Sequence, residues 1–103
     1  MFARTLHIGL KPASAAAFTN LIENEVIPSL QKQQGFQGEM VFVDAGGAEA
    51  IRITLWDEEE DADAYQGGDQ PKVLKSLANV VDGNPRVRSY RVSNSTFHRI
   101  VGR

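Results

Sequence analysis

The sequence predicts one α+β domain in which two helices cover one face of an antiparallel sheet. Three observations predict it. The chain has 103 residues, which is the size of one domain. Hydrophobic residues make up 42% and charged residues 23% of the chain, as in average globular proteins. The apolar residues recur with period two or with helical spacing in the order β-α-β-β-α-β.

Residues 2–10 form the first expected strand, because apolar and other side chains alternate along it. One face carries Leu6, Ile8 and Leu10, and the other carries Thr5, His7 and Gly9. Ser14 is the expected N-cap of the first helix. Pro28 lacks the N–H that would bond near Asn24, so we expect a kink there and a last turn that reaches about Gln33.

A hairpin is expected next, with strands at residues 38–44 and 50–56 around a turn at 45–48. In the second of these strands, Ile51, Ile53 and Leu55 share one face, and Arg52, Thr54 and Trp56 share the other. Asp57 can cap a second helix that breaks at Gly67-Gly68, and Asp69 with Pro71 restarts it.

The chain ends with an expected turn at residues 82–85, a strand at 86–92 and an extended segment at 96–101. This order is the ferredoxin-like split βαβ arrangement, whose sheet has one face bare of helices. We expect the bare face to carry the polar and aromatic set Thr5, His7, Arg52, Thr54 and Trp56. A bare face with a tryptophan favours pairing of two sheets in a homodimer.

Composition excludes several classes of function. The formal net charge is −2, which argues against a nucleic-acid or membrane binder, and no apolar run is long enough to span a bilayer. With no cysteine and only two histidines, we expect no transition-metal site. The N-terminus does not resemble a signal peptide, and the missing cysteines fit a reducing compartment, so we expect a cytoplasmic protein.

The charges divide unevenly along the chain. Residues 1–85 carry a formal charge of −7 and residues 86–103 carry +5. One interpretation is a solvated acidic helix start, at residues 57–63, and a basic terminal strand. The other is that the basic tail lies on an acidic surface of a partner copy, and we predict that residues 94–103 are a terminal extension that contacts the partner subunit.

Three short motifs in order resemble the antibiotic biosynthesis monooxygenase family: Pro28-Ser-Leu30, Gly35-Phe-Gln-Gly38, and a hairpin that ends Thr54-Leu-Trp56 before an acidic helix. The resemblance covers roughly residues 2–92. It implies a dimeric α/β-barrel of two sheet-paired ferredoxin-like subunits, each with a ligand cavity between its helices and its sheet. It also implies either cofactor-free oxidation of quinols or polyphenols, or heme degradation.

Within this resemblance, Trp56 lies at the position of the family's active-site tryptophan. Thr5 lies where heme-degrading members carry an asparagine, and Ala78 lies near their iron-ligating histidine. Because alanine cannot ligate iron, the comparison implies no heme, and we expect no cofactor.

His7 and Trp56 are the candidate catalytic residues. His7 is a possible general base because imidazole titrates near neutral pH, and Trp56 could stack on an aromatic ligand. The alternatives are a hydrogen-bonded interface histidine and simple packing. The candidate substrate-binding residues are Thr5, Arg52, Thr54 and Tyr90. Arg52 could bind an oxyanion or form an inter-subunit salt bridge, and Tyr90 could bind a ligand or merely pack.

The preferred function is a cofactor-independent monooxygenase that oxidises a small aromatic or quinol substrate. The alternatives are a non-catalytic dimeric ligand-binding or stress-response protein of the same fold, and an isomerase that uses the same cavity for proton transfer. A base within hydrogen-bond reach of a second polar group in the cavity would favour an enzyme.

Overall fold

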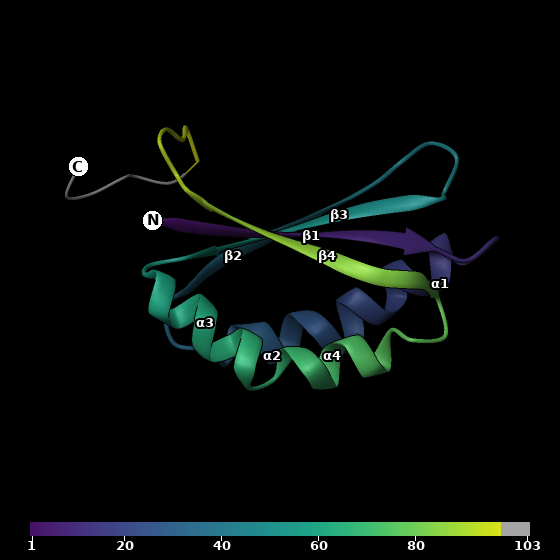
Figure 1. Ribbon diagram of the computed structural model, residues 1–103, viewed down its shortest axis with the longest axis horizontal. Coiled ribbons are helices and arrows are strands. Elements are labelled where there is room, and N and C mark those ends of the chain that lie inside the picture. Colours follow the sequence, from purple (N-terminus) through teal and green to yellow (C-terminus); the bar gives the residue numbers. More distant parts are fainter. Residues whose placement is uncertain (98–103) are drawn as a thin grey trace.

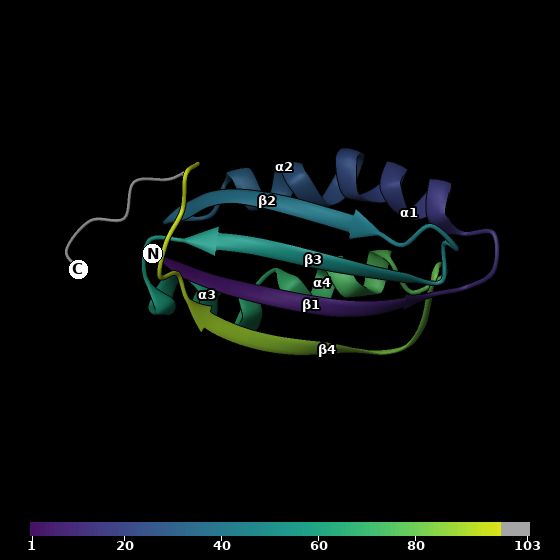
Figure 2. The ribbon, with the colours of Figure 1, turned by 90° about the horizontal axis from the view of Figure 1, so that it is seen from above.

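The computed structural model describes residues 1–97, and these form a four-stranded antiparallel sheet with every helix on one of its faces (Figures 1 and 2). The strands are β1 (Phe2–Leu10), β2 (Phe36–Val43), β3 (Glu49–Trp56) and β4 (Val81–Arg91), and their order in the sheet is β2-β3-β1-β4. The expected α+β, ferredoxin-like fold is confirmed.

The first helical arm is interrupted where the proline predicts. It consists of α1 (Ala15–Leu21), the π-helical turn η1 (Ile22–Val26) and α2 (Ile27–Gln31). A π-helical turn closes a wider hydrogen-bonded ring, so the chain stays helical across the missing N–H of Pro28 instead of ending there. The arm ends two residues before the expected Gln33.

The second arm is divided at the paired glycines, as expected, into α3 (Glu59–Gly67) and α4 (Gln70–Ser76). The expected cap is wrong: Glu58, not Asp57, occupies the N-cap position of α3. The Asp57 carboxylate instead accepts a hydrogen bond of 2.7 Å from the Gln37 side chain. Three acids follow in the first turn of α3, where the helix dipole favours negative charge.

The strands differ from expectation mainly at β4. Residues 82–85 lie within this strand instead of forming a turn, and a register shift between His7 and Gly9 of β1 absorbs the extra residues. Val81 is the first residue of β4. Of the extended segment expected at 96–101, only Thr96 and Phe97 fall within the described residues, and neither is in a strand.

The core lies between the sheet and the helices. Its largest fully buried side chains come from both layers: Trp56, Arg52, Phe18, Ile8, Leu30, Leu77 and Val26. An arginine among them is unusual, because a buried charge is costly unless it is paired. No helix among residues 1–97 is long and apolar enough to cross a membrane.

Candidate active site

A row of polar side chains crosses the helix-covered face of the sheet. The register sets Glu39 of β2, Thr54 of β3, Arg4 of β1 and Ser89 of β4 side by side, and we call these four the polar row. Arg4 and Thr54 are buried, and the Glu39 side chain is only 4% exposed. The protein therefore holds a polar layer where a core is normally apolar.

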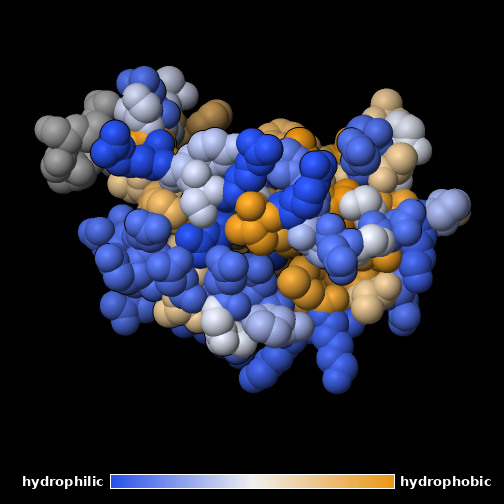
Figure 3. Space-filling view, in the orientation of Figure 1, coloured by the Kyte–Doolittle hydropathy of each residue, from blue (hydrophilic) through white to orange (hydrophobic). Residues whose placement is uncertain are grey.

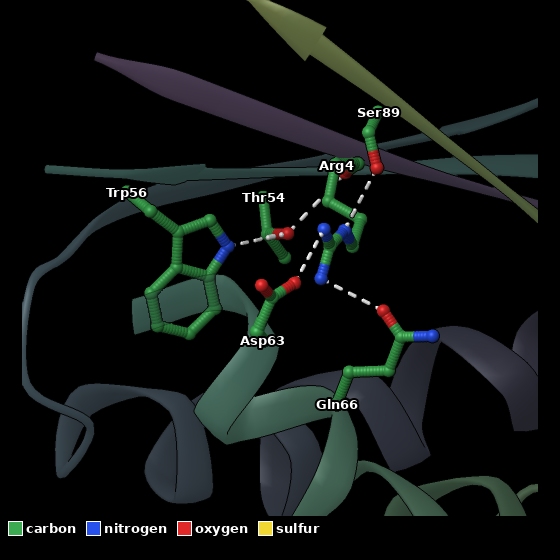
Figure 4. Close-up of polar contacts among 6 residues, drawn as sticks. All are labelled: Arg4, Thr54, Trp56, Asp63, Gln66 and Ser89. Carbon is green, nitrogen blue, oxygen red and sulfur yellow. Dashed lines mark hydrogen bonds and ion pairs between the residues drawn. The ribbon is translucent and has the colours of Figure 1, made fainter. Parts of the chain in front are cut away.

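Arg4 connects the polar row to the helix above it (Figure 4). Its Nε donates to Ser89 Oγ at 3.1 Å, and its two terminal nitrogens donate to Gln66 Oε1 at 2.7 Å and to Asp63 Oδ1 at 2.9 Å. The Asp63 side chain is 60% exposed, so water screens this ion pair and it adds little stability. The contacts fix where α3 lies on the sheet.

A buried ion pair lies next to the polar row. Arg52 Nε donates to Glu39 Oε2, and an Arg52 terminal nitrogen donates to the Tyr65 hydroxyl at 3.1 Å. The other carboxylate oxygen, Glu39 Oε1, is buried and has no hydrogen-bond partner within residues 1–97. A buried acceptor without a donor is rare in folded proteins and often marks a site where a ligand or water binds.

Burial sets the electrostatics of this group. It raises the pKa of Glu39 above 4.5, and the nearby charge and hydrogen bond of Arg52 only partly offset that effect. Burial also raises the pKa of Tyr65 above 10.0. Burial alone would lower the pKa of Arg52, but the charges of Glu39 and Tyr65 and the hydrogen bonds to them together outweigh it and raise that pKa. Arg52 thus stays charged, while Glu39 accepts a proton more readily than an ordinary glutamate.

Trp56 completes the cluster. Its ring is fully buried and lies 5.5 Å from Phe36 and 5.4 Å from Tyr65, centroid to centroid. Its Nε1 donates to Thr54 Oγ1 at 2.9 Å, and that hydroxyl donates to the Arg4 carbonyl at 3.3 Å (Figure 4). Every polar atom of the indole is satisfied, so Trp56 is held in one position by packing and by the polar row.

A small void lies beside these groups, between the sheet and α4. Its volume is about 10 Å³, and it is lined by Arg4, Thr5, Leu6, Arg52, Thr54, Gln70 and Val87. That is room for about one water-sized molecule. Figure 3 shows apolar side chains at the surface in the seam between β4 and the helices, and Val87 on this side of β4 is 39% exposed.

The structure separates the two candidate catalytic residues. His7 stands opposite Ile51 on the bare face, whereas Trp56 stands opposite Phe2 on the helix-covered face. The expectation that Thr5, His7, Arg52, Thr54 and Trp56 share the bare face is wrong: Thr5 and His7 lie there, and the other three lie under the helices. Tyr90 pairs with Ala3 on the bare face. One pocket cannot use both His7 and Trp56.

Sequence reasoning missed Glu39, Arg4 and Tyr65 as members of a site. The sequence contains a signal that could have identified Arg4, because this residue interrupts an otherwise apolar face of β1 that includes Phe2, Leu6 and Ile8. Glu39 and Tyr65 had none, since their meeting with Arg52 depends on tertiary packing. Among residues 1–97 no group of three or more acidic or histidine side chains could hold a metal ion.

The fold is that of solved structures named as antibiotic biosynthesis monooxygenases. One solved structure with the same fold is the monooxygenase from the gene ActVA-Orf6 of Streptomyces coelicolor, in complex with nanaomycin D. It superposes with a TM-score of 0.78 at 15% identity, over 91% of this chain and 88% of that one.

Two further structures are equally similar. SnoaB, a cofactor-independent oxygenase from Streptomyces nogalater, has a TM-score of 0.76 at 9% identity, over 92% and 95% of the two chains. NE2512 of Nitrosomonas europaea, a protein of unknown function, has a TM-score of 0.76 at 14% identity, over 92% and 91%. No family model and no curated protein matches the sequence. At these identities the likeness shows the fold alone.

Proposed function

We propose that the protein is a cofactor-independent monooxygenase that oxidises a small phenol or quinol in the interior between its sheet and its helices. The observation that carries the proposal is the buried, unpartnered Glu39 Oε1 beside the charged Arg52. The oxygenases SnoaB and the ActVA-Orf6 product, which have the same fold, support the reaction class.

In this proposal Glu39 replaces His7 as the general base. The substrate hydroxyl donates to Glu39 Oε1 and transfers its proton there, and the Arg52 guanidinium stabilises the phenolate. The raised pKa of Glu39 suits this task, because a base that binds its proton more tightly takes it more readily from a phenol. Trp56 offers an aromatic wall against which the ring can pack.

Dioxygen then reacts directly with the substrate anion. One oxygen atom becomes a carbonyl oxygen on a ring carbon that carried hydrogen, and the other leaves as water. A phenol and dioxygen thus yield a quinone and water, and the substrate supplies all four electrons. The proton held by Glu39 passes to the departing water, which returns the carboxylate to its starting state.

Binding of a ring requires the helical layer to move. The void of about 10 Å³ is far smaller than the cavity of about 150 Å³ that holds benzene in an engineered protein. The contacts between Arg4 and α3 would break in such a movement, and the exposed Asp63 pair among them costs little to break.

Oxygen uptake with a panel of quinols and phenols tests the proposal. Glu39→Gln should lower kcat by about 100-fold, the usual size of a general-base effect. Glu60→Gln, an exposed glutamate of α3, is the matched control and should keep the wild-type rate. No uptake with any substrate, or equal rates in wild type and Glu39→Gln, would overturn it.

The second candidate is a non-catalytic ligand-binding protein. A cavity of about 310 Å³ favours it, with a mostly apolar lining that includes Met1, Met40, Leu55 and Phe97, and Glu39 also lines it. This volume suits a small ring. Phenol that binds without oxygen uptake, and binds more weakly to Leu55→Glu, would favour this candidate.

We further propose that two chains pair through their bare sheet faces. The large apolar side chains exposed on this face include Met40, Phe42, Ile51 and Tyr90. Phe97, in the terminal segment beside the same face, is 85% exposed. Exposed apolar groups of this size usually mark an interaction surface, and a second copy would cover them.

A further inference from the structure

The bare face of the sheet has a gap at the end of β1. The register sets Gly9 between Glu49 of β3 and Asp82 of β4, so no side chain fills the space between the two carboxylates. In the next row, His7 stands beside Arg86. A Cβ on Gly9 would lie 2.7 Å from the Asp82 carbonyl oxygen, so only glycine lets the backbone of β4 lie this close to β1.

A bulge in β4 widens this gap into a cavity. Between His7 and Gly9 of β1, β4 runs from Arg86 to Asp82, so it holds two more residues than its partner. Gly83 has a φ of 79°, which glycine adopts without strain. The resulting hollow has a volume of about 230 Å³. Bulges often occur next to binding sites because they redirect side chains.

The polar groups around this hollow are not engaged elsewhere. Within residues 1–97, the side chains of His7, Glu49, Asp82, Asn84 and Arg86 form no ion pair and no hydrogen bond. The arginines on the other face of the sheet, by contrast, are fully paired. One hollow is therefore lined by two carboxylates, a guanidinium, an imidazole and an amide, and each of these groups can still form hydrogen bonds to a ligand.

We propose that this corner binds a small zwitterion, namely a free α-amino acid or a molecule with the same ammonium and carboxylate groups. The ammonium lies in the hollow, near the carboxylates of Glu49 and Asp82, and the carboxylate binds the Arg86 guanidinium as a bidentate pair. Asn84 and His7 supply further hydrogen bonds. A ligand with one sign of charge would leave the opposite groups unpaired, and this selects for the zwitterion.

The corner is distinct from the candidate active site. It lies on the opposite face of the sheet from Glu39 and Arg52, so the inference does not rest on the oxygenase proposal. Ile51, one of the exposed apolar side chains of the bare face, lines the hollow, so the corner adjoins the proposed dimer surface. Tyr90 lies at the other end of β1.

Calorimetric titration of the full chain tests the proposal. The probes are α-amino acids of graded size, together with propionate and ethylamine, which are alanine without its ammonium and without its carboxylate. We expect saturable binding below about 10 mM for amino acids. Propionate and ethylamine, the one-ended probes, should bind about tenfold or more weakly, because each lacks one charged group and leaves the side chain that would pair with it without a partner.

Two pairs of variants locate the site. Arg86→Gln and Glu49→Gln should weaken binding about tenfold or more. Arg88→Gln, on the same strand and face, and Glu60→Gln, on α3, should change it less than about twofold. All four positions are exposed, so all four variants should keep the wild-type melting temperature.

Three results would overturn the proposal: no amino acid binds, the one-ended probes bind as tightly as alanine, or the control variants weaken binding as much as the site variants. If Glu49→Gln instead weakens self-association, and no amino acid binds to the wild type, the corner is a contact between subunits.

Discussion

Removal of the Arg52 guanidinium should destabilise the protein strongly, and the structure gives the size of the effect. In Arg52→Met the side chain keeps much of its length, but Glu39, whose side chain is 4% exposed, loses the cation that pairs with it, and the Tyr65 hydroxyl loses a donor. Breaking a buried ion pair from one side costs about 3–5 kcal/mol. For a domain of this size, that lowers the melting temperature by about 12 °C or more.

The pH dependence identifies the cause. Burial already raises the pKa of Glu39 in the folded wild type, and loss of Arg52 removes the charge that offsets this rise. A carboxyl with a raised folded pKa binds more protons when folded, so stability falls as pH rises from about 4.5 through the raised value. Arg52→Met should therefore lose less stability at acidic than at neutral pH.

The double variant Arg52→Met with Glu39→Leu tests whether the unpaired Glu39 charge causes the loss of stability in Arg52→Met. With both charges gone, an apolar pair of similar volume should restore most of the lost stability, because desolvation offsets much of what a buried pair contributes. Urea unfolding at two pH values measures all three proteins. A loss below about 1 kcal/mol in Arg52→Met, or no recovery in the double variant, would refute the reasoning.

Three further predictions follow from the same contacts. Trp56→Ala should cost about 3–5 kcal/mol in urea unfolding, whereas Trp56→Phe should cost clearly less; equal losses would contradict the role of packing. If the protein is a dimer, Phe42→Glu should raise the dissociation constant of the dimer about tenfold or more in analytical ultracentrifugation. Deletion of residues 94–103 should also weaken the dimer. An unchanged dissociation constant in both variants would count against sheet pairing. His7→Ala should leave quinol oxidation intact, since His7 lies on the other face of the sheet from Glu39, and a 100-fold loss would return the base to His7.

Local patterns were enough to predict most of the fold. Period-two alternation located β1 and β3, paired glycines located the break between α3 and α4, and Pro28 located the irregular turn of the first arm. Each of these signals acts within a few residues. The bulge in β4 was missed because Asp82-Gly83-Asn84-Pro85 has the composition of a turn, and only pairing with β1 keeps it extended.

The site was harder to predict because alternation gives two faces without saying which is covered. In β3 the apolar set Ile51, Ile53 and Leu55 looked like the inner face, yet the helices cover Arg52, Thr54 and Trp56. The polar residues are buried because they have partners on other elements, and the spacing of residues within one strand or helix does not predict such partners.

The most direct test of the proposed function is oxidation under ¹⁸O₂ with mass spectrometry of product and water. The account predicts that each turnover places one labelled atom in the quinone and one in water, and that Glu39→Gln lowers both yields together. Hydrogen peroxide with an unlabelled product would show an oxidase instead. No product with any phenol or quinol would show that the unpartnered Glu39 oxygen does not serve this reaction.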